Sequence, residues 1–162
     1  MSYNEVDILK RMPVRKGVYF LPFHLDHGYQ CKAVDEYDSE QTTIEDRIQM
    51  LDRQSQAGPC ITAFANSKPL ALFGCVLLWS GVGEAWSLLS EEARRYPITM
   101  TKAATAFFDA CEDILHLHRL QITVKSTDKR AVGWANTLGF VSEGLMIAYS
   151  ADKDDTYIMR RK

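Results

Sequence analysis

The stretch ITVKSTDKRAVGWANTLGFVSEGLM, residues 122–146, tells most about the fold of this 162-residue chain. It reads as the end of a strand over 120–125, a polar turn, a short helix and a second strand. Asp128 can accept hydrogen bonds from the free amides of the first helical turn, and Gly139 stands where a helix end favours positive φ. The predicted helix has one apolar face, made by residues at spacings of three and four: Ala131, Trp134, Ala135 and Leu138.

Strand-forming and helix-forming runs follow one another along the rest of the chain, after an irregular or helical lead-in over 1–16. Their order, β-α-α-β-β-β-α-β-α-β-β, contains no repeat or linker and predicts one mixed α/β or α+β domain over residues 1–162. The run over 70–79 is almost continuously apolar, which is typical of a central strand covered on both faces. The predicted strands cover 17–23, 60–65, 70–79, 84–90, 120–125, the stretch after Phe140 and the end of 150–159, with a turn at 66–69; the predicted helices cover 25–35, 42–56, 98–115 and the segment after Asp128.

Composition and charge exclude several classes of protein. A net charge of −2 and a pI near 6.1 argue against a dedicated nucleic-acid binder, which normally has a basic surface. No run approaches the roughly 18 apolar residues needed to span a bilayer, and the first residues lack the apolar core of a signal peptide. We therefore expect a cytoplasmic protein with no membrane partner. The four cysteines contain no C-x-x-C pair and are expected to be reduced packing residues: Cys31, Cys60, Cys75 and Cys111.

One pair of histidines has the spacing of metal ligands. His24 and His27 could place two imidazoles on one helical face. Two ligands without a nearby third acid or cysteine make a poor zinc site, so we expect no metal.

The segment that opens this section resembles the C-terminal motif of the GNAT superfamily of acyl-CoA-dependent N-acyltransferases. Members often carry N-x-x-A-x-x-x-Y-x-x-x-G-F followed by E-G, and the order of elements over the whole chain also matches. The resemblance implies a mixed, mostly antiparallel twisted sheet flanked by about four helices. It also implies transfer of an acetyl group from acetyl-CoA to a primary amine by direct attack in a ternary complex. The matching residues are Asp128, Ala131, Leu138, Gly139, Phe140, Glu143 and Gly144.

The resemblance also assigns site residues. In GNAT proteins a loop with the pattern R/Q-x-x-G-x-G/A cradles the pyrophosphate of acetyl-CoA at a helix N-terminus, and the corresponding stretch here is 90–101. Glu84, at the start of the fourth strand, is the candidate general base for the acceptor amine; an ordinary exposed strand-end carboxylate is the alternative. Backbone groups over 86–89 are expected to meet the acyl and pantetheine groups. The implied acetyl-CoA contacts are Leu88, Leu89, Arg94, Arg95, Tyr96, Ile98, Thr99, Asp128 and Trp134.

Two departures from the superfamily pattern favour a second hypothesis. The loop over 90–101 contains no glycine, and Tyr96, Pro97 and Ile98 occupy positions where bare backbone normally lets phosphates approach. Ala135 stands where many GNAT enzymes have the tyrosine that protonates the leaving thiolate. The second hypothesis is a catalytically degenerate GNAT-like protein that serves in binding or assembly.

The stretches 81–97 and 127–140 are also similar to GNAT-like proteins encoded by tailed bacteriophages, some of them virion-associated. Trp79 and Trp86 are expected to pack on the third and fourth strands, and Trp86 alternatively to line the acceptor groove. The sequence names neither the acceptor nor the oligomeric state.

Overall fold

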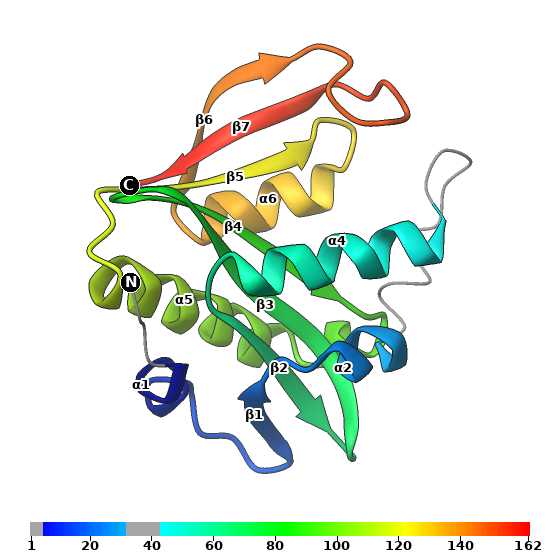
Figure 1. Cartoon of the computed structure of the whole chain (residues 1–162), viewed down its shortest axis with the longest axis vertical. Helices are drawn as coiled ribbons and strands as arrows, with labels where there is room; N and C mark the ends of the chain where they lie inside the picture. The colour runs from blue at the N-terminus through cyan, green and yellow to red at the C-terminus, as the bar shows by residue number, and fades with distance from the viewer. Residues whose placement is uncertain (1–4, 32–42) are drawn as a thin grey trace.

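The computed structural model describes residues 5–31 and 43–162 and contains one sheet with helices on both of its faces (Figure 1). None of the helices in these ranges is long and apolar enough to cross a membrane. The elements are α1 (Glu5–Lys10), β1 (Val18–Pro22), α2 (Leu25–Gln30), α4 (Ile44–Gln56), β2 (Cys60–Ala65), β3 (Lys68–Trp79), β4 (Val82–Leu89), a 3-10 turn η1 (Glu92–Arg95), α5 (Pro97–Ile114), β5 (Arg119–Lys125), α6 (Lys129–Thr137), β6 (Phe140–Met146) and β7 (Thr156–Arg161).

The sheet has seven strands in the order β1-β2-β3-β4-β5-β7-β6. Every neighbouring pair is antiparallel except β4 and β5, which are parallel. This confirms the mixed, mostly antiparallel sheet that the resemblance implied.

The helices divide the interior into two unequal cores (Figure 1). On one side of the sheet, here called the α5 face, α5 and α6 cover the main core, in which Phe73 of β3 meets Phe107 of α5. On the other side, the α4 face, α2 and α4 cover a smaller cluster that includes Leu51 and Leu72. Strand β3 is buried over 69–75 because it has a core on each face, which confirms the predicted central strand.

The helix of the diagnostic segment is bounded as predicted. Asp128 Oδ1 accepts a hydrogen bond from the amide of Ala131 at 3.0 Å, and Gly139 takes a φ of +93° after the last turn. Ala135 and Leu138 are buried against the main core. The spacing of three and four therefore correctly identified the packed face of α6.

Some sequence expectations were wrong or lie outside the described residues. Trp79 does not pack: it is 67% exposed and is the last residue of β3, beyond an irregularity in the pairing with β4. Lys68 and Pro69, predicted in a turn, already belong to β3. The helix predicted over 25–35 ends at Gln30, and 32–35 lie outside the described residues.

The four cysteines are free and buried, as expected. Burial raises the pKa of the Cys60 and Cys111 thiols well above their usual value. Since the thiolate is the reactive form, these two side chains act as packing groups.

Candidate functional site

Strands β4 and β5 separate within the sheet and create the opening around which the site is built. Residues 82–84 of β4 pair with 119–121 of β5, and the described pairing between the two strands stops there. Residues 85–89 of β4 continue to pair with β3 only, while β5 continues alongside β7 (Figure 1). The backbone edge of β4 over 85–89, which includes the predicted Leu88 and Leu89, is therefore open toward the gap.

Glu84 lies at the last paired position of β4, where the gap begins. Its carboxylate is half-buried, and Oε1 accepts a hydrogen bond from Gln121 Nε2 of β5 at 3.1 Å. The Glu84 carboxylate is therefore partly buried and hydrogen-bonded to Gln121, unlike a fully solvated carboxylate at a strand end.

The start of α5 lies beyond the other end of the gap. Tyr96 precedes the helix, Pro97 is its first residue, and the amide of Met100 bonds to the carbonyl of Tyr96 at 2.8 Å. Within the described part of the chain, the amides of Ile98 and Thr99 have no hydrogen-bond acceptor. Unpaired amides at a helix start, together with the helix dipole, favour an anion.

A hollow of about 360 Å³ opens at this first turn of α5. Lys102, which the sequence analysis did not single out, supplies its cation. The sequence feature that could have identified Lys102 is its spacing of four from Ile98, which places both side chains on one side of the helix. The hollow is lined by Pro97, Ile98, Thr101 and Lys102.

The predicted loop residues are arranged unequally around this hollow. Tyr96 packs against the main core, and the guanidinium of Arg15 lies 5.4 Å from its ring centroid, so its ring is not among the groups that line the hollow. Arg94 forms an ion pair with Glu91, whereas Arg95 is exposed without an ion-pair partner among the described residues.

Thr99 and the residues of α6 occupy structural positions. The Thr99 side chain is only 3% exposed, so it does not reach the surface of the hollow. Asp128 is occupied with capping α6. Trp134 donates from Nε1 to Thr101 Oγ1 at 3.0 Å and thereby ties α6 to the wall of the hollow.

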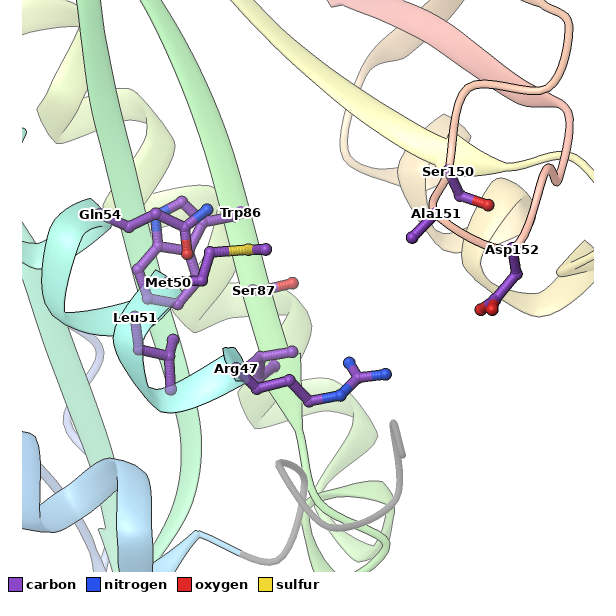
Figure 2. Close-up of a pocket in the computed structure, with 10 residues that line it drawn as sticks. Arg47, Met50, Leu51, Gln54, Trp86, Ser87, Ser150, Ala151 and Asp152 are labelled. Atoms are coloured by element: carbon purple, nitrogen blue, oxygen red, sulfur yellow. The ribbon is translucent and has the colours of Figure 1, made fainter. Parts of the chain in front are cut away.

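A second cavity, of about 390 Å³, lies on the α4 face between α4, β4 and the hairpin that joins β6 to β7 (Figure 2). Trp86 lines this cavity and also packs against the smaller cluster and Gly74 of β3, which confirms the expected packing; its role in an acceptor groove stays a prediction. The buried indole N–H of Trp86 has no hydrogen-bond acceptor among the described residues. In Figure 2 the Asp152 side chain extends from the hairpin into the space facing α4. The lining residues are Arg47, Met50, Leu51, Gln54, Trp86, Ser87, Leu88, Ser150, Ala151 and Asp152.

The two histidines considered as metal ligands have other roles. The side chain of His24 caps α2, and Nδ1 of His27 lies 2.9 Å from Thr62 Oγ1. Burial, followed by repulsion from His24, lowers the pKa of His27. In residues 5–31 and 43–162, no three His, Cys, Asp or Glu side chains are grouped so that they could hold a metal ion.

Comparison with solved structures identifies the fold. No family model matches the sequence, and no curated protein does. Ard1 from Thermoplasma volcanium superposes with a TM-score of 0.73 at 13% identity, covering 90% of this chain and 97% of that one. Ribosomal-protein-S5-alanine acetyltransferase from Vibrio fischeri gives 0.71 at 13% identity, covering 92% and 94%. An acetyltransferase of the GNAT family from Streptococcus pneumoniae gives 0.67 at 16% identity, covering 89% and 98%. The chain therefore has the fold of the GNAT acetyltransferases.

Proposed function

We propose that this protein is an N-acyltransferase that moves an acetyl group from acetyl-CoA to a primary amine. One observation carries the proposal: the divergence of β4 and β5 leaves a gap with Glu84 at its closed end. The anion-favouring start of α5 and the cleft beside α4 provide separate places for the two substrates. Support also comes from the fold, which is shared with proteins described as N-acetyltransferases.

Acetyl-CoA fits this arrangement in spite of the missing glycines. The unpaired amides of Ile98 and Thr99, with Lys102 and Arg95 nearby in the chain, suit its phosphates. The open backbone edge over 85–89 can hydrogen-bond the pantetheine amides. Because Tyr96 packs against the core, it leaves the hollow free, and Pro97 removes only one amide donor.

The acceptor amine enters from the cleft on the α4 face. Met50, Leu51 and Trp86 offer apolar contact, and the Asp152 carboxylate attracts a cationic group. Near neutral pH the acceptor amine is present as an ammonium ion, which must lose a proton before its nitrogen can attack.

In the proposed reaction the Glu84 carboxylate accepts that proton. The amine nitrogen then forms a bond to the thioester carbonyl carbon and gives its second proton to solvent, and the C–S bond breaks as the tetrahedral intermediate collapses. The released thiolate takes a proton from solvent, because Ala135 stands where a tyrosine could have supplied it. The net exchange is one C–N bond for one C–S bond, with no oxidation or reduction.

A binding or assembly protein with the same fold is the second candidate. Pro97 at the start of α5 and Ala135 on α6 favour it, because each removes a group that acyl transfer normally uses. The two candidates differ in turnover, which a single variant can test.

Glu84→Gln is that variant. It should lower kcat by about 10²–10⁴ while leaving acetyl-CoA binding unchanged, as expected for loss of a general base. Release of free thiol from acetyl-CoA is measured over a panel of diamines, amino acids, peptides and aminoglycosides. Glu45→Gln, an exposed carboxylate on the first turn of α4, is the control. Equal rates in wild type and Glu84→Gln would contradict the assigned base, and acetyl-CoA binding without thiol release would favour the binding protein.

A further inference from the structure

A chain of charged and polar side chains runs across four strands, β6, β7, β5 and β4, and ends on Glu84 of β4. Arg119 Nε donates to Gln121 Oε1 at 2.9 Å, and Gln121 Nε2 donates to Glu84 Oε1 at 3.1 Å. At the other end, Glu143 of β6 accepts from Arg119 Nη2 at 2.5 Å and from Arg160 Nε of β7 at 3.2 Å. Leu120 points into the main core, so its neighbours Arg119 and Gln121 lie on the α4 face, the face of the acceptor cleft.

The direction of the hydrogen bonds in this chain follows from the chemistry of arginine. A guanidinium group has N–H donors and no acceptor, so the Gln121 atom that Arg119 Nε contacts must be the carbonyl oxygen. The NH₂ group of Gln121 is then the end that faces Glu84. Without Arg119 the side-chain amide could turn over and present its oxygen, which would repel the carboxylate.

The surroundings of Glu84 leave one of its oxygens for another partner. Glu84 is opposite Val76 in β3 and Gln121 in β5, and Val76 offers no hydrogen bond. Among the described residues Oε1 has the Gln121 donor, and Oε2 has none. A carboxylate held through Oε1 presents Oε2 in a fixed direction at the closed end of the gap.

We propose that Gln121 is a positioning residue for Glu84, and that Arg119, anchored by Glu143, fixes the Gln121 amide in its donating orientation. The inference rests on the proposed function, in which Glu84 takes the proton of the acceptor amine. Holding the carboxylate in one rotamer places Oε2 for proton transfer. It also gives a role in this chain to Glu143, the glutamate of the E-G pair in the diagnostic segment.

The test that does not depend on activity is an NMR measurement of the Glu84 side-chain rotamer. Gln121→Met removes the donor at similar volume, so Glu84 should change from one rotamer to an average over several. Arg119→Met should have the same effect, whereas Arg119→Lys keeps a donor for Gln121 Oε1 and should restore a single rotamer. Thr123→Val, a half-buried change two residues along the same face of β5, is the control and should leave the Glu84 rotamer unchanged.

Kinetics supplies the second measurement. In Gln121→Met we expect kcat to fall about tenfold, with KM for both substrates within about twofold of wild type. A single, unchanged Glu84 rotamer in Gln121→Met would overturn the inference, whatever the rates. Rotamer averaging with transfer unaffected in both Gln121→Met and Glu84→Gln would support the hydrogen bond and contradict the proton-transfer role of Glu84 in the proposed function.

Discussion

The indole of Trp86 in β4 lies directly against the bare backbone of Gly74, its partner in β3. A Cβ atom built at Gly74 would be 2.2 Å from Trp86 Cε2, far inside van der Waals contact. Since Trp86 also lines the cleft on the α4 face, where we propose that the acceptor enters, the missing side chain at Gly74 determines where that wall of the cleft stands.

Replacing Gly74 with alanine should therefore displace the Trp86 ring toward the cleft. We expect a loss of about 1–3 kcal/mol in unfolding free energy from overpacking, measured by urea denaturation, and a higher KM for the acceptor. Gly133→Ala is the matched control, because a Cβ there meets nothing within 4 Å and the helix interior should gain up to about 1 kcal/mol. Equal stability of Gly74→Ala and wild type would show that the ring has room to move.

The link between α6 and α5 is testable as a single hydrogen bond. Trp134→Phe removes the donor to Thr101 Oγ1 and Thr101→Val removes the acceptor. A double-mutant cycle by urea denaturation should give a coupling of about 0.5–1.5 kcal/mol, the net value of a typical hydrogen bond. Strictly additive losses would mean that the two side chains do not interact.

The contribution of Glu143 to stability should depend on pH. The hydrogen bond from Arg119, with further help from Arg160, lowers the pKa of Glu143. A pKa that is lower in the folded state than in the unfolded state stabilises the protein at pH values above the unfolded-state pKa, about 4.3 for glutamate. This stabilisation is lost as the pH falls through the folded-state pKa. Glu143→Gln should therefore have a lower Tm than wild type at pH 7 and nearly the same Tm at pH 3.

Glu92→Gln serves as the control for that experiment, because Glu92 forms no ion pair among the described residues. Its Tm difference from wild type should not follow the same pH course. A Glu143→Gln difference that is constant from pH 3 to pH 7 would contradict the charge-based account.

The start of α5 can be blocked without disturbing the core. Ile98 is 67% exposed, and Ile98→Glu would place a carboxylate beside the unpaired amides of the first turn. A negative charge suits a helix start, so folding should be preserved, while the phosphates of acetyl-CoA should be repelled. We expect at least about a tenfold rise in the Kd of acetyl-CoA, because a loss of about 1.4 kcal/mol in binding free energy raises Kd tenfold.

The same change at Ile147, which is 71% exposed in the β6–β7 hairpin, is the control. Ile147→Glu should bind acetyl-CoA as wild type does. If both variants bind equally well, the phosphates do not lie at the start of α5.

Local patterns in the sequence were enough to predict most of the fold. The α6 boundaries followed from Asp128 and Gly139, because capping and positive φ are properties of a few neighbouring residues. The buried β3 strand followed from its unbroken apolar run. The prediction that Trp79 packs was wrong, because no local pattern indicates the irregular pairing of β3 with β4 that precedes this last residue of the strand.

The site was less accessible to sequence reasoning because it joins distant segments. Gln121 reaches Glu84 only through the parallel pairing of β4 with β5, a contact between residues 37 positions apart. The cleft on the α4 face combines α4, β4 and the β6–β7 hairpin, and within its lining the sequence assigned substrate contacts only to residues 86–88 of β4. The roles assigned to Arg95 and Ile98 and the similarity to phage proteins remain predictions.

The most direct test of the central claim, that acyl-CoA binds between the diverging strands and the start of α5, is a thermal shift with acetyl-CoA. A ligand at 100 times its Kd adds about 2.7 kcal/mol to stability, which corresponds to roughly 5–10 °C in Tm for a domain of this size. We predict a rise of this order in wild type, with CoA giving a similar rise. An unchanged Tm at millimolar acetyl-CoA would contradict the claim.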